Sequence, residues 1–188
     1  MLCQTARLPT AHVALVEQLT QELGAGRILA DLYRRNYFIV KHGHGEAYQL
    51  HPLFHEFLLH RAQEIYSLAQ LNALGGQAAL LLAAAGDIEA AARLWRTASD
   101  WVALATHILK HALALVTQAR FQLLETWLCA LPVITLARTP WLHYWLEVIL
   151  AKAGSLLSKA FLLRSLPKLF RGFSKPLIPG KPQAVRVF

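Results

Sequence analysis

The chain has 188 residues, of which 55% are hydrophobic, with many Leu and Ala among them. This length and composition favour one or two domains of packed helices over a disordered chain. The formal net charge of +8 is concentrated at one end, because residues 1–154 carry 12 basic and 11 acidic side chains while residues 155–188 carry 7 basic and none acidic. The body of the chain is therefore nearly neutral.

The sequence favours a protein of the cytoplasm. Cys3 and Cys129 lie far apart without a metal-ligand spacing, which is typical of reduced cysteines used as small apolar side chains. The first residues lack the pattern of a secretory signal peptide. No uncharged apolar stretch approaches the roughly 20 residues that span a bilayer, so we expect no membrane segment.

The first third of the chain predicts a small winged-helix unit. Residues 10–23 place Val13, Val16, Leu19 and Leu23 on one helical stripe, with Thr10 as the expected N-cap. A glycine-containing break at 24–26 precedes a second helix over 28–36. The β-forming run 37–40, the turn-prone run 41–45 and the run 47–50 predict a two-stranded wing, and a further helix opens at His51-Pro52.

From residue 61 to about residue 164 the chain predicts helices only, with breaks at Gly75-Gly76, Gly86-Asp87, Pro132, Pro140 and Gly154. Residues 80–86 match residues 148–154 when the register is shifted by 68, and a shift of 33 aligns residues 88–95 with residues 121–128. These shifts are one and two periods of about 34 residues, the length of a tetratricopeptide-type repeat. The sequence thus predicts stacked helical hairpins.

The basic end, residues 166–188, contains several prolines and departs in composition from the rest. We expect a solvated, disordered tail, although a basic tail can also bind nucleic acid or anionic lipid.

Few motifs indicate chemistry. Nine histidines suggest a metal site, and His51 and His55 have an i, i+4 spacing, but no carboxylate or thiolate completes a ligand set, so we expect no metal. The glycine-containing run 23–27 lacks both the Lys-Ser/Thr pair and the preceding strand of a P-loop. No catalytic constellation stands out, so we expect no enzyme and no cofactor in this chain.

Three basic residues of the winged-helix unit are candidates for phosphate or DNA contact, namely Arg34, Arg35 and Lys41. They form a thin patch that Asp31 and Glu46 dilute, so we do not expect direct DNA binding by this unit.

Residues 28–64 resemble the winged-helix module of MalT-like, LuxR-family ATP-dependent transcriptional regulators. The resemblance rests on a spaced pattern before the wing and another behind it, formed by Leu29, Leu32, Asn36, Phe38, Tyr48, His51, Leu53, Phe54, Phe57 and Leu58. Residues 84–95 and 120–145 resemble the tetratricopeptide-like sensor region of the same regulators.

This resemblance implies a signal-transduction ATPase of the STAND class. In such proteins a nucleotide-binding domain precedes the winged helix, helical repeats sense an inducer or partner, and a C-terminal helix-turn-helix binds promoters. A histidine at the start of the winged-helix helix reaches the bound nucleotide in related switch ATPases, and His51 matches that position. The alternative is that His51 only caps the helix that follows the wing. ATP or ADP is thus implied only for the full-length family.

We therefore expect an all-α protein with a winged-helix unit at residues 1–65, tetratricopeptide-like repeats at 66–165 and a basic tail at 166–188. The expected function is that of a regulatory fragment of a MalT-like regulator, in which the repeats bind an inducer or partner and the winged helix docks on a nucleotide-binding domain outside this sequence. An exposed docking surface would favour self-association. The alternative is a standalone helical-repeat adaptor that binds other proteins.

Overall fold

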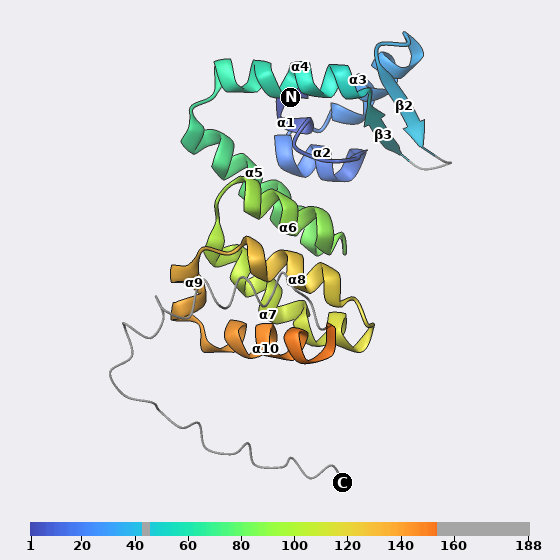
Figure 1. Ribbon diagram of the computed structural model, residues 1–188. Helices are drawn as coiled ribbons and strands as arrows, with labels where there is room; N and C mark the ends of the chain where they lie inside the picture. The colour runs from blue at the N-terminus through green and yellow to red at the C-terminus, as the bar shows by residue number, and fades with distance from the viewer. Residues whose placement is uncertain (43–45, 154–188) are drawn as a thin grey trace. The chain divides into compact units, whose positions relative to one another are not determined.

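The computed structural model describes residues 1–42 and 46–153 (Figure 1). These residues belong to two compact units, Met1–His111 and the described part of Ala112–Phe188. The predicted tail at 166–188, the predicted break at Gly154 and the wing residue His44 lie outside the described residues. The predicted domain boundaries at residues 65 and 165 stay predictions.

The described residues form ten helices and three strands. The helices are α1 (Leu2–Thr5), α2 (Val13–Thr20), α3 (Ala25–Arg34), α4 (Pro52–Ile65), α5 (Leu68–Ala84), α6 (Ile88–Thr97), α7 (Trp101–Thr117), α8 (Phe121–Ala130), α9 (Val133–Arg138) and α10 (Pro140–Ala153). The strands are β1 (Ala11–His12), β2 (Ile39–His42) and β3 (Ala47–Leu50). The predicted fold class, mostly helical with a small winged-helix unit, is confirmed.

The wing contains one strand more than the sequence predicts. β2 and β3 form the expected antiparallel hairpin, with Ile39 opposite Leu50 and His42 opposite Ala47. The short strand β1 pairs with the other edge of β3, so the sheet order is β1-β3-β2. The prediction of a helix over 10–23 was wrong at both ends, because residues 11–12 pair in the sheet and α2 ends at Thr20. The N-cap is His12 rather than Thr10.

The second helix begins three residues earlier than predicted, since Gly24 is its N-cap and Gly26 lies inside α3. A Cβ atom added to Gly26 would lie 2.8 Å from Cγ1 of Val13, which opens α2. Glycine at position 26 thus permits the close packing of α2 on α3.

The core of the winged-helix unit joins these helices to α4. Val16 of α2 and Leu29 of α3 are completely buried, and Leu58 and Ala62 of α4 are buried as well. α1 packs on α4, and α2 packs on α5. The unit thereby buries one face of each helix.

The helix α5 runs without interruption through Gly75-Gly76, so the predicted break there was wrong. A capping box fixes its start, in which the Ser67 hydroxyl accepts from the Gln70 amide and the Gln70 side chain accepts from the Ser67 amide. The predicted break at Gly86-Asp87 is confirmed, because Gly86 has a φ of +90° and Asp87 caps α6. α5 and α6 pack against each other, and Ala78 of α5 and Ala91 of α6 are completely buried.

In the second unit, α10 packs on α8 and α9. Leu124, Leu136, Leu142 and Ile149 are completely buried in this small core. The predicted breaks at Pro132 and Pro140 are confirmed, since α9 follows Pro132 and α10 begins at Pro140. The 34-residue periodicity of the helices stays a prediction.

No helix within residues 1–42 and 46–153 is long and apolar enough to cross a membrane.

Candidate docking site around His51

His51 stands where β3 gives way to α4. Its backbone amide donates to the Phe38 carbonyl at 2.7 Å, which ties the start of the helix to the residue before β2. Pro52 follows at the first helical position, where its missing N–H costs nothing. The first free amide of the helix is therefore that of Leu53, and it donates to Nδ1 of His51 at 3.3 Å.

This capping hydrogen bond determines which imidazole nitrogen can donate a hydrogen bond to a partner. Because Nδ1 accepts a hydrogen bond, the neutral ring carries its proton on Nε2. The side chain of His51 is exposed. His51 thus presents an N–H donor at the N-terminus of a 14-residue helix, where the helix dipole favours negative charge.

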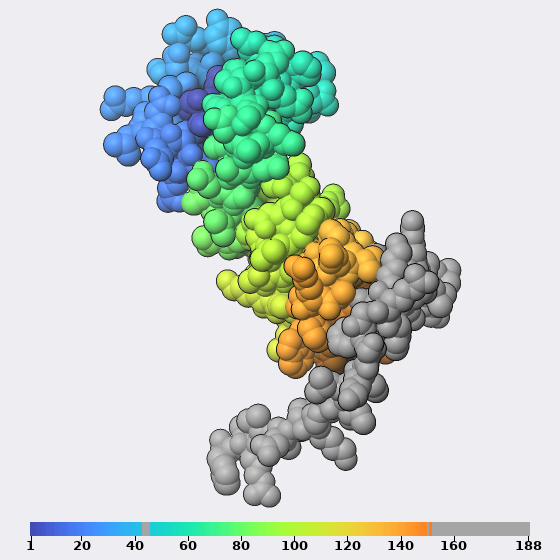
Figure 2. Space-filling view, turned by 90° about the vertical axis from the view of Figure 1, so that its left-hand side faces the viewer, coloured from blue at the N-terminus to red at the C-terminus, as the bar shows by residue number. Residues whose placement is uncertain are grey.

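Aromatic side chains continue from His51 across the surface. The ring centroids of His51 and Phe38 are 6.2 Å apart, those of Phe38 and Phe54 are 5.9 Å apart, and those of Phe54 and Phe57 are 6.4 Å apart. Phe38, Leu53 and Phe57 remain 59%, 70% and 60% exposed. We call these five residues (Phe38, His51, Leu53, Phe54 and Phe57) the His51 face, and α4, which carries three of them, lies on the surface of its unit in Figure 2.

Phe38 reaches this face through an unfavourable backbone conformation. Its φ is +55°, and that of Asn36 is +56°. A left-handed conformation costs a residue with a side chain roughly 1–2 kcal/mol. The strained backbone at Phe38 thus places an aromatic ring that remains largely exposed to water.

The predicted phosphate contacts are less available than their sequence suggests. Arg35 Nε lies 2.9 Å from Asp31 Oδ2, and Arg34 lies 3.8 Å from the same carboxylate. Lys41 is exposed on β2. One acid therefore offsets two of the three bases, and the prediction that the unit does not bind DNA stays a prediction.

Two histidines of the winged-helix unit bind different partners. His55 Nε2 donates to the Ala6 carbonyl at 2.8 Å, and His42 Nε2 contacts Gln49 Oε1. Within residues 1–42 and 46–153, no three His, Cys, Asp or Glu side chains are arranged to hold a metal ion.

A second histidine site, which the sequence reasoning did not single out, lies in the helices that follow. His107 of α7 is buried, its Nε2 donates to the Ile88 carbonyl at 3.0 Å, and its ring centroid lies 4.7 Å from that of Trp95 and 4.5 Å from that of His111. Burial lowers the pKa of His107, and the neighbouring His111 and Lys110 lower it further while the Ile88 carbonyl raises it. Burial also lowers the pKa of His111. Nothing in their i, i+4 spacing alone distinguishes them from surface histidines.

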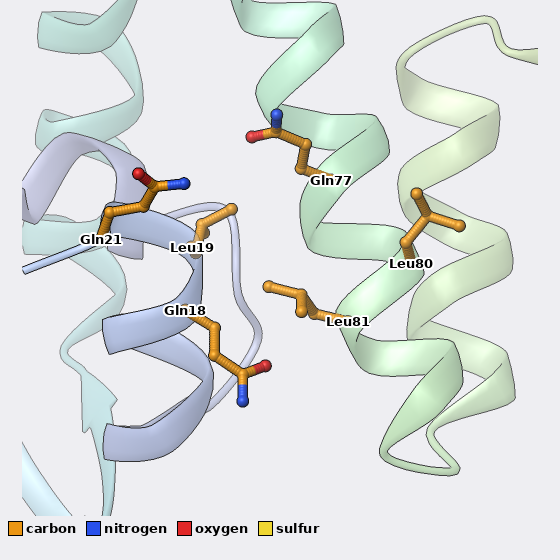
Figure 3. Close-up of a pocket in the computed structure, with 6 residues that line it drawn as sticks. All are labelled: Gln18, Leu19, Gln21, Gln77, Leu80 and Leu81. Atoms are coloured by element: carbon orange, nitrogen blue, oxygen red, sulfur yellow. The ribbon is translucent and has the colours of Figure 1, made fainter.

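One pocket opens between α2 and α5, and its volume is about 220 Å³ (Figure 3). It is lined by Gln18, Leu19, Gln21, Gln77, Leu80 and Leu81. Figure 3 shows Leu19 of α2 and Gln77 and Leu81 of α5 directed toward the space between the two helices, whereas Leu80 points to the other side of α5. No pattern in the sequence indicates this pocket, because it depends on how two separate helices pack.

Comparison with known proteins finds a match for the first 70 residues. Residues 1–70 match the model of the MalT winged helix domain, and the search of curated proteins found no match to the chain. The matched region contains α1 to α4, the three strands and His51. The predicted MalT-like resemblance is confirmed over residues 1–70, which match the MalT winged helix domain.

Proposed function

We propose that this chain works in transcription regulation as the winged-helix and sensor part of a MalT-like, LuxR-family, ATP-dependent regulator of the STAND class. In this proposal the His51 face docks on a nucleotide-binding domain, and the helices from α5 onward sense an inducer or a protein partner in the cytoplasm. The proposal assigns no enzyme activity to these 188 residues.

The observation that carries the proposal is the His51 face itself. Large aromatic side chains are normally buried, and a contiguous exposed group of them marks an interaction site. Here three phenylalanines and a leucine adjoin a histidine whose Nε2–H faces away from its own cap. The strained backbone at Phe38 supports a functional reason for this arrangement.

In this proposal, His51 makes the docking of the His51 face depend on the bound nucleotide. An imidazole N–H at a helix N-terminus suits a phosphate oxygen, because donor and dipole both favour negative charge. The apolar side chains around it would exclude water and strengthen that hydrogen bond. We propose that the apolar part of the His51 face supplies the docking energy and that His51 makes the docking sensitive to a bound diphosphate.

The test measures binding of this chain to the separately produced, ADP-loaded nucleotide-binding domain of a MalT-like regulator. Phe57→Asp should weaken binding at least tenfold, because it places a charge in the apolar contact, which costs several kcal/mol. Leu68→Asp is the matched control, since Leu68 is 74% exposed at the start of α5, away from the face. Circular dichroism checks that both variants fold.

Equal weakening by both variants would contradict the assignment of the face. No binding by the unaltered chain would favour the standalone adaptor.

A further inference from the structure

Phe38 contacts His51 through both its backbone and its ring. Its carbonyl accepts a hydrogen bond from the His51 amide at 2.7 Å. The two ring centroids lie 6.2 Å apart with an interplanar angle of 59°, which is a tilted arrangement of the kind that aromatic pairs favour. The ring of Phe54 lies against Phe38 in turn, with the centroids 5.9 Å apart. The imidazole of His51 therefore has a neighbouring ring that α4 itself supports.

A tight turn brings the ring of Phe38 to His51. Phe38 has a φ of +55°, and its amide donates to the Asn36 carbonyl at 3.1 Å. The Tyr37 amide donates to the Leu32 carbonyl at 3.0 Å, which ties the turn to the end of α3. Glycine adopts such a φ without strain, whereas a bulky side chain rarely does. The turn alone therefore does not account for an aromatic residue at this position.

Two contacts restrain the exposed imidazole of His51. The Leu53 amide donates to Nδ1 at 3.3 Å, which favours the tautomer with its proton on Nε2. This distance is longer than that of a strong hydrogen bond, so the Leu53 amide alone holds the ring weakly. The ring of Phe38 adds a second restraint, because it limits how far the imidazole can rotate. The direction of the Nε2–H bond thus depends on Phe38.

We propose that Phe38 is a positioning residue that acts through His51, because its carbonyl and its ring aim the Nε2–H of His51 before a partner binds. A donor that is already fixed loses less side-chain entropy on binding, so the same hydrogen bond contributes more to affinity. This inference rests on the proposed docking of the His51 face and specifies how its nucleotide-dependent hydrogen bond is directed. It gives the strained backbone at Phe38 a function.

Nuclear magnetic resonance of the full chain tests the positioning without any partner. In mildly alkaline buffer, the ¹⁵N shifts of a neutral imidazole distinguish its two tautomers, and His51→Ala identifies the signals of His51. We expect the Nε2–H tautomer in the unaltered chain and a mixture in Phe38→Leu, which removes the ring but stays apolar. Phe57→Leu is the matched control, since Phe57 is 60% exposed, as Phe38 is 59% exposed, and its ring lies against Phe54. This control should keep the tautomer of the unaltered chain.

Binding to the ADP-loaded and the nucleotide-free nucleotide-binding domain of a MalT-like regulator measures the consequence for docking. A hydrogen bond to a charged group contributes roughly 10- to 150-fold to an equilibrium constant. Phe38→Leu should lower the ratio of the two affinities at least threefold, because the His51 donor is then aimed less often. Phe57→Leu should weaken both affinities alike and leave their ratio unchanged. Phe38→Tyr keeps the ring and should keep the ratio of the unaltered chain.

A double-mutant cycle separates positioning from a direct contact of Phe38 with the partner. In the His51→Ala background, Phe38→Leu should no longer change the ratio, because the donor that Phe38 aims is absent. A His51 tautomer that Phe38→Leu leaves unchanged would overturn the inference, and so would a change in the ratio that persists undiminished in His51→Ala. A lack of ADP dependence in the unaltered chain would instead contradict the proposed function, and the resonance measurement on the free chain would still decide whether Phe38 positions His51.

Discussion

Replacement of Gly26 by Ala tests the packing on which the winged-helix unit depends. Gly26 lies in α3, and its missing side chain leaves room for Val13 of α2. A methyl group there would lie 2.8 Å from Val13 Cγ1, inside van der Waals contact. Valine is branched at Cβ and has few rotamers in a helix, so its side chain cannot easily turn away.

Two effects of opposite sign decide the result. Alanine is the better helix former by roughly 0.5–1 kcal/mol. Forcing an extra carbon into a packed contact costs about 1–3 kcal/mol. Because the contact at Gly26 is short and its neighbour is stiff, overpacking dominates, and we expect a net loss of about 1–2 kcal/mol in the free energy of unfolding.

Gly76→Ala is the matched control. Gly76 is also helical, in α5, but a Cβ atom there would meet nothing within 4 Å. Only the propensity effect applies, so this variant should gain about 0.5–1 kcal/mol.

Urea unfolding, followed by circular dichroism, measures both changes. Adding Val13→Ala to Gly26→Ala removes the methyl group that collides and should recover part of the loss. Equal stability of Gly26→Ala and Gly76→Ala would refute the reasoning, because it would mean that α2 and α3 are not held at this distance.

Three further predictions concern the helices after the wing. Ser67→Ala removes the capping box of α5 and should lower the free energy of unfolding by about 0.5–2 kcal/mol in urea unfolding. Trp95→Ala should cost about 3–5 kcal/mol because its ring is buried, whereas Trp141→Ala, at a side chain 66% exposed, should change stability little in the same assay. The pKa values of His107 and His111 are lowered in the folded chain, so the unfolded chain binds more protons in acid, and the free energy of unfolding should fall as the pH drops below about 6.5. Urea unfolding at several pH values should show a shallower fall for His107→Gln than for the unaltered chain. An equal fall would contradict the assignment of this pH dependence to His107.

The sequence predicts those features of the fold that arise from local pattern. His51-Pro52 marks a helix start because proline suits the first helical position, and Gly86-Asp87 marks a turn because it combines a left-handed residue with an N-cap. The hairpin of β2 and β3 follows from its β-forming residues and turn.

Features set by tertiary contact escape such reasoning. The two-residue strand β1 has no periodicity and exists through its pairing with β3. The helix α5 continues through two glycines, and Gly75 is buried where a Cβ atom would lie 3.5 Å from the Ala98 methyl group, so the packing of α5 rather than its glycine content decides where the helix ends. A propensity rule cannot anticipate either result.

In the candidate site, too, some features follow from local sequence pattern and others from tertiary contact. The position of His51 follows from the sequence, by its resemblance and by the start of the helix. The aromatic neighbours of His51 do not, since Phe38 reaches α4 only through the left-handed backbone at residues 36 and 38. Leu23 shows the opposite error, because helical spacing predicts it in the core and the early end of α2 leaves it exposed.

Hydrogen–deuterium exchange of the full chain, with and without the ADP-loaded nucleotide-binding domain of a MalT-like regulator, tests the central proposal most directly. We expect the amides of residues 53–58, at the start of α4, and of residues 36–39 to become protected on addition of that domain. Those of α5 should exchange unchanged, and His51→Ala should reduce the difference between ADP-loaded and nucleotide-free partner. Protection confined to helices other than α4, or no protection at saturating partner, would contradict the assignment of the His51 face.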